Sequence, residues 1–299
     1  MNYDTLCFSS GGTAGISYIG AIACLIKSKI LNLNTIKKYV GTSIGAIFLF
    51  FILLDYSILE INNIVIDYDL KCLQGDITID EVLQKHGFCN GDNLVSFLKN
   101  ILKKKKNIND ITFYDLYNKY NKNFIVIGTN LSNGTEEAFN YINNPNMSVI
   151  LAIRISVSLP AVFTPVLYNN NYYVDGGLKN TFPINYCDQK TTLAINLPYS
   201  SKYEVNNIFD VCINSMQIAL KSISTKNNYI DNHNIINVNS LEGYSFFNFD
   251  ITTKDKIKFI IVGWNHTLEH INNNKKYYVS ALVDDMKPAS LLCDINYSF

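Results

Sequence analysis

The feature that most constrains the fold is a glycine–serine turn between a short strand pattern and an apolar helix pattern. Lys38–Val40 predicts a strand, and Ile44–Leu54 reads IGAIFLFFILL, which predicts a buried helix. The turn that joins them fits GxSxG and consists of Gly41, Thr42, Ser43, Ile44 and Gly45. Its glycines permit a sharp turn that lifts the serine hydroxyl to a helix N-terminus, where the dipole favours negative charge. Ser43 is therefore a candidate nucleophile, although GxSxG alone is a modest signal.

A second glycine-rich turn follows the first predicted strand, Tyr3–Ser9, and opens a predicted helix over Gly15–Lys29. It consists of Ser10, Gly11, Gly12, Thr13, Ala14 and Gly15. Its small residues let backbone N–H groups approach either an oxyanion or a phosphate. The GK[ST] ending of a Walker A loop is absent, and Ser10 interrupts the dinucleotide-binding pattern. A plain tight turn is the third interpretation.

A third motif, Asp175, Gly176 and Gly177, begins at the last residue of the short strand predicted over Tyr172–Asp175. A carboxylate at a strand end can accept the proton of a nearby serine, although Asp-Gly is also a common turn dipeptide.

The rival to this aspartate is a histidine base, and the four histidines are His86, His233, His266 and His270. In α/β-hydrolases the serine comes before the acid and the histidine and follows a later strand than Ser43 does. His266 and His270 lie off the apolar stripe of the amphipathic helix predicted over Lys256–Ile271, which places them on the surface. The sequence therefore favours an aspartate as the base.

The remaining pattern is that of an α/β protein. Strands are predicted over Phe124–Asn130 and Thr192–Leu197, and helices over Met147–Val157 and Asn206–Ser224. The stretch Ser57–Lys106 is mostly helical, with a break at Gly87–Asn90. Two strand–turn–helix units in the first 55 residues point to an α/β sheet. Neither a linker nor a repeat interrupts the pattern, so residues 1–299 are expected to form a single domain.

Charge and cysteine usage exclude several functions. Lys plus Arg and Asp plus Glu each number 25, so the formal net charge is zero, which argues against nucleic-acid binding. The seven cysteines are widely spaced and form no CxxC, which indicates reduced thiols. Since no His/Cys cluster is visible, we expect neither a metal nor a cofactor.

The sequence points to a cytoplasmic protein that touches membranes peripherally. No signal peptide is visible, and the eleven residues of Ile44–Leu54 are too few to span a bilayer, which takes about 20. The four lysines of Lys103–Lys106 fit a solvated helix end or, alternatively, weak attachment to an anionic membrane surface.

In this order, the three motifs resemble those of the patatin-like phospholipase family. They read FSSGGTAG, VGTSIGA and YVDGG, and the segments FIVIGTNLSNG, RISVSLPAVFTPV and KFIIVGW also resemble family segments. The likeness spans about residues 3–270. Three positions depart from the family pattern: Ser10 replaces a glycine, Ala14 a basic residue, and Thr181 an asparagine.

The resemblance implies a three-layer α/β/α fold around a mostly parallel sheet, and lipid acyl hydrolysis by a Ser–Asp dyad that needs no metal. Ser43 would be the nucleophile and Asp175 the general base, and N–H groups around Gly11, Gly12 and Thr13 would hold the oxyanion. The implied substrate is a phospholipid or another acyl lipid, cleaved as by a phospholipase A2 or a lysophospholipase. The alternatives are a triacylglycerol lipase, an acyltransferase, or a catalytically degenerate lipid-binding protein.

Two further features have a functional and a structural interpretation. Arg154, the sole arginine, would orient an anionic head group or form a structural ion pair. The helices of Ser57–Leu70 and the aromatic segments near Phe88, Phe97 and Phe163 would line an acyl channel or simply pack in the core.

Overall fold

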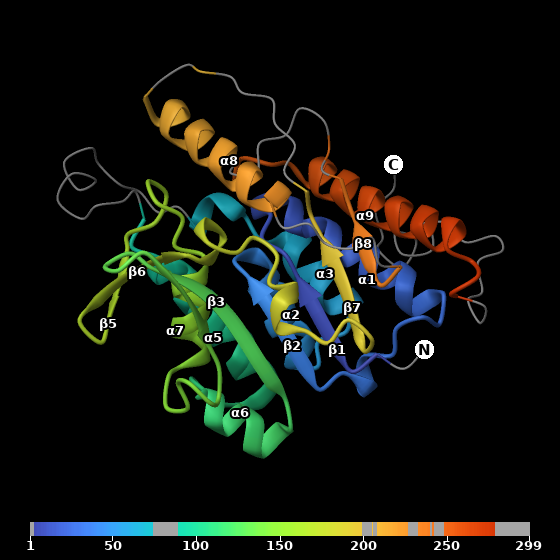
Figure 1. Cartoon of the computed structure of the whole chain (residues 1–299), viewed down its shortest axis with the longest axis horizontal. Coiled ribbons are helices and arrows are strands. Elements are labelled where there is room, and N and C mark those ends of the chain that lie inside the picture. The colour runs from blue at the N-terminus through green and yellow to red at the C-terminus, as the bar shows by residue number, and fades with distance from the viewer. Residues whose placement is uncertain are drawn as a thin grey trace.

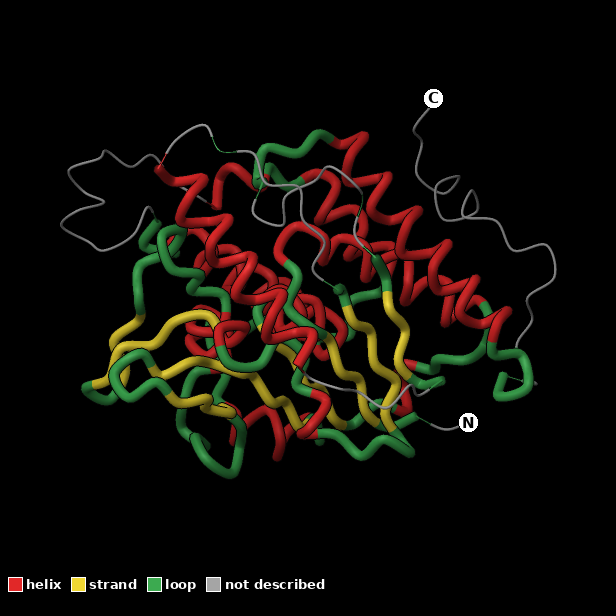
Figure 2. The backbone as a smooth tube through the Cα atoms, turned by 45° about the horizontal axis from the view of Figure 1, so that its top comes forward, coloured by secondary structure: helices red, strands yellow, loops and turns green. Residues whose placement is uncertain are grey.

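The computed structural model describes residues 3–73, 89–198, 205, 208–226, 233–239, 241 and 248–278. The chain folds as a mixed α/β structure, in which a central, mostly parallel sheet is flanked by helices (Figures 1 and 2). The strands are β1 (Thr5–Phe8), β2 (Lys38–Thr42), β3 (Asn123–Asn130), β4 (Thr135–Phe139), β5 (Val166–Tyr168), β6 (Asn171–Asp175), β7 (Thr192–Asn196) and β8 (Ile235–Asn237). Their order is β5-β6-β3-β2-β1-β7-β8, with β4 paired to β3. The expected fold class is thereby confirmed.

The sheet has a parallel and an antiparallel part. Strands β3, β2, β1, β7 and β8 pair in parallel, whereas β4 and β6 both run antiparallel to β3 and β5 runs antiparallel to β6. Parallel strands all end at one edge of a sheet, which is where functional loops gather in open α/β folds. The turns that follow β1 and β2 therefore emerge on the same side.

The helices follow the sequence predictions except for α6, which was not predicted, and the predicted break at Gly87–Asn90 lies partly outside the described residues. They are α1 (Ser17–Lys27), α2 (Ile44–Leu53), α3 (Ile58–Asp67), α5 (Asp92–Lys106), α6 (Phe113–Tyr120), α7 (Val149–Ser156), α8 (Ile208–Lys226) and α9 (Thr253–Asn273). Short 3₁₀ turns include η1 (Gly12–Ile16), η3 (Leu70–Leu73), η4 (Gly176–Leu178) and η5 (Ile184–Tyr186). Three strands were not predicted. β5 and β8 are only three residues long, and β4 reads TEEAF, whose two glutamates are poor strand formers.

The sheet separates two cores of unequal size. Alternate residues of β1, β2, β3 and β7 point to opposite faces, as the strand period requires. One set, with Phe8 and Tyr39 among its members, joins the large core formed with the helices. The other set, with Cys7 and Val40 among its members, joins a smaller core covered by Phe182 and the residues that follow it. Helix α8 contacts η4, next to this smaller core.

Helices α1 and α9 lie against each other on one side of the sheet (Figure 1). Their backbones touch at two glycines. A β-carbon on Gly20 would lie 1.8 Å from the carbonyl oxygen of Ile260, and one on Gly263 would lie 1.9 Å from that of Ser17. Only residues without a side chain permit so close an approach of two helices.

The apolar stripe predicted for α9 was only partly right; it consists of Ile257, Ile260, Ile261, Trp264, Leu268 and Ile271. Ile260, Trp264 and Ile271 are buried, but the buried face also includes Lys256 and Gly263. The hydrophobic period missed these two because a lysine and a glycine carry no apolar signal. Lys256 can be buried because its ammonium group donates hydrogen bonds to main-chain carbonyls at the end of α3.

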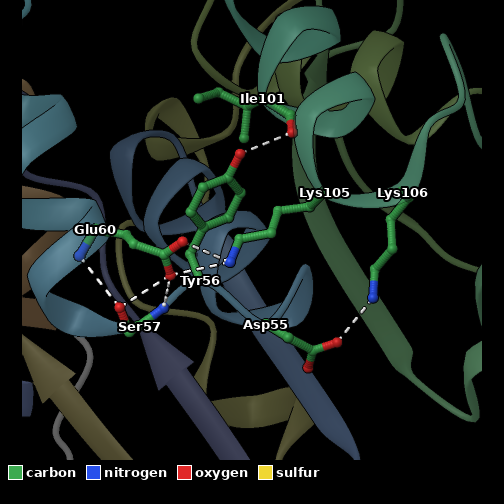
Figure 3. A network of polar contacts seen from close by, with 7 residues as sticks. All are labelled: Asp55, Tyr56, Ser57, Glu60, Ile101, Lys105 and Lys106. Atoms are coloured by element: carbon green, nitrogen blue, oxygen red, sulfur yellow. Dashed lines mark hydrogen bonds and ion pairs between the residues drawn. The ribbon is translucent and has the colours of Figure 1, made fainter.

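The lysine run at the end of α5 is not simply a solvated helix end. Lys105 forms hydrogen-bonded ion pairs with both oxygens of Glu60 at 2.7 and 2.9 Å and lies over the ring of Tyr56 (Figure 3). Lys106 pairs with Asp55 at 2.8 Å. Two of the four lysines therefore tie α5 to the start of α3, while Lys103 and Lys104 stay exposed. Among the described residues, no helix combines the length and the apolar character that crossing a bilayer requires.

The glycine contact between α1 and α9 predicts a loss of stability in Gly263→Ala. The added methyl group would overlap the carbonyl of Ser17, and we expect the free energy of unfolding to fall by about 1–3 kcal/mol. The steric overlap should therefore outweigh the gain of about 1 kcal/mol in helix propensity that alanine brings over glycine. Urea unfolding followed by circular dichroism measures it. Asn265→Ala, on the exposed face of α9, is the control and should leave stability nearly unchanged. A Gly263→Ala protein as stable as the wild type would contradict the prediction.

Candidate active site

Ser43 and Asp175 meet because β2 and β6 share one edge of β3. On β3, Ile127 pairs with Thr42 of β2, and the next residue, Gly128, pairs with Asp175 of β6. Because β4 also pairs with Ile127 and Gly128, β4 lies along one edge of β3, and β2 and β6 share the other edge. Along that shared edge β2 and β6 run toward each other, so their C-terminal ends meet. Ser43, directly after Thr42, lies beside Asp175.

The backbone at Ser43 turns sharply. Its φ is 54° and its ψ is −126°, a left-handed conformation that is unusual for a residue with a side chain. Its N–H donates to the hydroxyl of Ser156 at 2.8 Å, which ties the turn to the last residue of α7. A β-carbon on Gly45 would lie 2.5 Å from the carbonyl oxygen of Ser9, so the second glycine of GxSxG is required by close approach to β1.

The Asp175 carboxylate is buried and makes two hydrogen bonds. It accepts from the Ser43 hydroxyl at 2.7 Å through Oδ2 and from the amide of Gly177 at 2.7 Å through Oδ1. Burial raises the pKa of Asp175 to about 7, although both hydrogen bonds act to lower it. The carboxylate is therefore a stronger base than an exposed one, and it is already in contact with the hydroxyl it would deprotonate.

The first glycine-rich turn lies beside this pair. Gly12 and Thr13 line the same cavity as Ser43 and Asp175. Gly12 has a φ of 52°, and among the described residues no acceptor takes up the amides of Gly11 and Gly12. The N–H groups of Gly11 and Gly12 are therefore suited to donate to the oxyanion that forms when the serine attacks an ester carbonyl.

The departures from the family pattern in this turn fit the structure. Ser10 keeps a negative φ, so the change from glycine introduces no backbone strain. Its amide donates to the carbonyl of Thr181 at 2.7 Å, which links the turn to the segment after Asp175. Ala14 packs in the large core, where a basic side chain would be desolvated.

Two serines with supporting positions were not singled out from the sequence. The Ser9 hydroxyl accepts a hydrogen bond from the amide of Leu197 and donates one to the carbonyl of Ser10, each at 2.8 Å. Ser9 thereby holds the glycine-rich turn against the end of β7. Ser156 holds the turn at Ser43. Both lie in segments that resemble the family, FSSGGTAG and RISVSLPAVFTPV, but nothing in those segments marked either serine as a supporting residue.

An apolar cavity of about 120 Å³ starts at the two candidate catalytic residues. Its wall includes residues from α2, α3, α5 and the segment after α7. Val65, Tyr68, Phe97 and Phe163 belong to it, so segments expected either as an acyl channel or as core packing do line a cavity. Phe88 lies outside the described residues.

Arg154 serves the wall of this cavity rather than a ligand. Its guanidinium is buried and donates to the carbonyls of Asn90 and Thr164 and to the Ser158 hydroxyl. It also lies 5.2 Å from the ring centre of Phe163. Within the described residues, the guanidinium pairs with carbonyls and hydroxyls and with no carboxylate, so the expected ion pair is not seen there. Its burial argues against contact with a head group.

Among the described residues, the Ser43 hydroxyl bonds to Asp175 and not to a histidine. His266 and His270 are on α9, and neither they nor His233 lines the cavity. The ring of His270 contacts the carbonyl of His233, and both histidines are only partly buried. His86 lies outside the described residues.

The sequence and the fold are similar to those of known proteins. The family model for patatin-like phospholipases matches residues 6–188. Uncharacterized protein R571 of Acanthamoeba polyphaga mimivirus is 28% identical over 268 residues, which cover 84% of this chain and 88% of that protein. The probable lipid hydrolase 463L of Invertebrate iridescent virus 6 is 31% identical over 185 residues, which cover 61% of this chain and 62% of that protein.

Two bacterial proteins share the fold. VipD from Legionella pneumophila superposes with a TM-score of 0.56 at 17% identity, over 91% of this chain and 67% of VipD. The type III effector ExoU of Pseudomonas aeruginosa superposes with a TM-score of 0.53 at 14% identity, over 91% of this chain and about half (53%) of ExoU. The family match covers more than half of the sequence and includes all three glycine-rich motifs. This chain belongs to the patatin-like phospholipase family.

Proposed function

We propose that this protein is a lipid acyl hydrolase that cleaves fatty-acyl esters with a Ser43–Asp175 dyad. The observation that carries the proposal is the 2.7 Å hydrogen bond from the Ser43 hydroxyl to a buried carboxylate at the end of an apolar cavity. Membership of the patatin-like phospholipase family supports it, as does a viral relative named a probable lipid hydrolase.

In the first half of the reaction, Asp175 takes the Ser43 proton as the serine oxygen attacks the ester carbonyl. The carbonyl oxygen becomes an oxyanion, which the amides of Gly11, Gly12 and Thr13 would hold. As the tetrahedral intermediate collapses, the bond to the leaving alcohol breaks and Asp175 returns the proton to it. An acyl-enzyme and a free alcohol, such as a lysophospholipid, result.

In the second half, water repeats these steps. Asp175 removes a proton from water, the hydroxide attacks the acyl-enzyme, and Ser43 leaves with the proton that Asp175 held. The fatty acid is released and the dyad is restored. Because a single carboxylate serves as base and acid in both halves, its pKa near neutrality suits both tasks.

The proposed substrate is a phospholipid or a related acyl lipid reached at a membrane surface. The cavity wall is almost wholly apolar, which suits an acyl chain rather than a polar group. Peripheral contact with a membrane is part of this proposal, because such substrates reside in bilayers.

Removing either member of the dyad should abolish hydrolysis. We expect Ser43→Ala to lower kcat by about 10⁴-fold or more, and Asp175→Asn by about 10²- to 10⁴-fold. Fatty-acid release from mixed phospholipid vesicles is the measurement, and the lipid profile of the products identifies the substrate. Asp115→Asn, which changes a half-buried carboxylate on α6 that does not line the cavity, is the matched control and should retain wild-type activity.

Three outcomes count against this assignment. Retained activity in either dyad variant would refute the dyad. A folded wild-type protein that releases no fatty acid would favour the degenerate lipid-binding alternative. Transfer of the acyl group to an acceptor alcohol in place of release would indicate an acyltransferase.

The raised pKa of Asp175 predicts the pH dependence of the reaction. Burial raises this pKa to about 7, so below that pH the carboxyl group is protonated and cannot accept the serine proton. We expect kcat/KM to fall about tenfold per pH unit below about pH 7 and to level off above it. Rates between about pH 5 and pH 9, on a substrate without ionisable groups, measure this. A flat profile across that range would show that no group with a pKa near 7 is the base.

A further inference from the structure

The cavity follows helix α2 away from Ser43. Ile44, Ile47, Phe48 and Phe51 line it, at the spacing of one face of a helix. From Ser43 to Phe51 the helix advances eight residues, or about 12 Å at about 1.5 Å per residue. Since the reacting carbonyl must lie at Ser43, an acyl chain in this cavity would run along α2 toward Phe51.

Three aromatic rings meet on the cavity wall at Phe51. Phe97 of α5 packs edge-on against Phe51, with the two ring centres 6.1 Å apart. Its ring is tilted against that of Tyr68, with the ring centres 4.5 Å apart. All three line the cavity. We call Phe51, Tyr68 and Phe97 the aromatic end wall. Phe97 is its central member because it contacts both other rings.

The end wall is held in place from behind by Lys256. The Lys256 ammonium group donates to the carbonyls of Val65, Ile66 and Tyr68, at 3.0, 3.0 and 2.6 Å. These carbonyls form the end of α3 and the residue after it, so one buried cation fixes the segment that carries Tyr68. A wall secured by three hydrogen bonds to a charged group resists displacement by a longer ligand.

We infer that the aromatic end wall limits the acyl chain to medium length, so that octanoate and decanoate esters are preferred over palmitate esters. An extended chain advances about 1.3 Å per carbon, given a C–C bond of about 1.5 Å, so about 12 Å accommodates roughly nine carbons. The inference rests on the proposed hydrolase function and adds a chain-length limit and the residues that set it.

Hydrolysis of p-nitrophenyl esters from butyrate to palmitate tests the limit. We expect wild-type kcat/KM to peak at octanoate or decanoate and to be at least about tenfold lower for palmitate. Phe97→Ala should open the end wall and raise the palmitate-to-octanoate ratio by about tenfold. Ile47→Phe, one helical turn from Ser43, should shift the optimum toward shorter esters. A palmitate rate equal to the octanoate rate in the wild type, or an unchanged ratio in Phe97→Ala, would overturn the inference.

Tyr117→Ala is the control, because it also removes from a helix an aromatic ring that packs against another ring, although Tyr117 is exposed. Tyr117 stacks on Tyr141 at 3.8 Å and does not line the cavity. The palmitate-to-octanoate ratio of Tyr117→Ala should equal that of the wild type. If Tyr117→Ala changed the ratio as Phe97→Ala does, a general loss of rigidity would explain both, and the end wall would not be the cause.

A binding measurement separates failure of the inference from failure of the proposed function. Titration calorimetry with free fatty acids on Ser43→Ala needs no turnover. Affinity should rise about fourfold per added carbon up to about decanoate and then stop rising. In Phe97→Ala the rise should continue to longer acids. Absence of hydrolysis together with this pattern would refute the hydrolase and retain the chain-length limit. Affinity that climbs steadily to palmitate, or is independent of length, would refute the limit.

Discussion

The candidate site depends on the pairing of two strands with one edge of β3. β2 approaches in parallel and stops at Ile127, while β6 approaches in antiparallel and stops at Gly128. Their ends meet on a continuous strand whose hydrogen bonds fix the register. A one-residue slip of either strand would turn its side chains to the other face of the sheet and separate Ser43 from Asp175. The serine–carboxylate contact is thus a consequence of backbone pairing, and the loops around it adapt to that geometry.

Burial of Asp175 links reactivity to stability. The fold removes the carboxylate from water, which raises its pKa to about 7 against about 3.9 for a free aspartate. Because the folded state binds this proton more tightly than the unfolded state does, folding is favoured at low pH, and the advantage is lost as pH rises through about 7. The ionised form that would do the chemistry is therefore the less stable form. Such a conflict is common at active sites.

Local patterns predicted the elements that carry the motifs, but not the edge of the sheet or the supporting contacts. The predicted strands at β1, β2, β3, β6 and β7 are present, because each is a compact apolar run next to a turn. β5 became a strand only by pairing with β6. The apolar period on α9 did not predict that Gly263 and Lys256 are buried. Gly263 is buried because it has no side chain and lets α1 approach, and Lys256 because its ammonium group bonds to carbonyls of α3. Arg154 likewise gave no local sign that its partners would be carbonyls and hydroxyls.

By itself, the sequence determined the α/β class, the turns at Ser10 and Ser43, and the residue types for a serine–aspartate mechanism. These follow from local physics, since glycine spacing, strand runs and helix periods act over a few residues. The tertiary structure alone decided that Asp175 lies 2.7 Å from Ser43 and that Phe97, Phe51 and the two catalytic candidates line one cavity. Those contacts join segments far apart in the chain. They depend on strand register and helix packing, which no local pattern encodes.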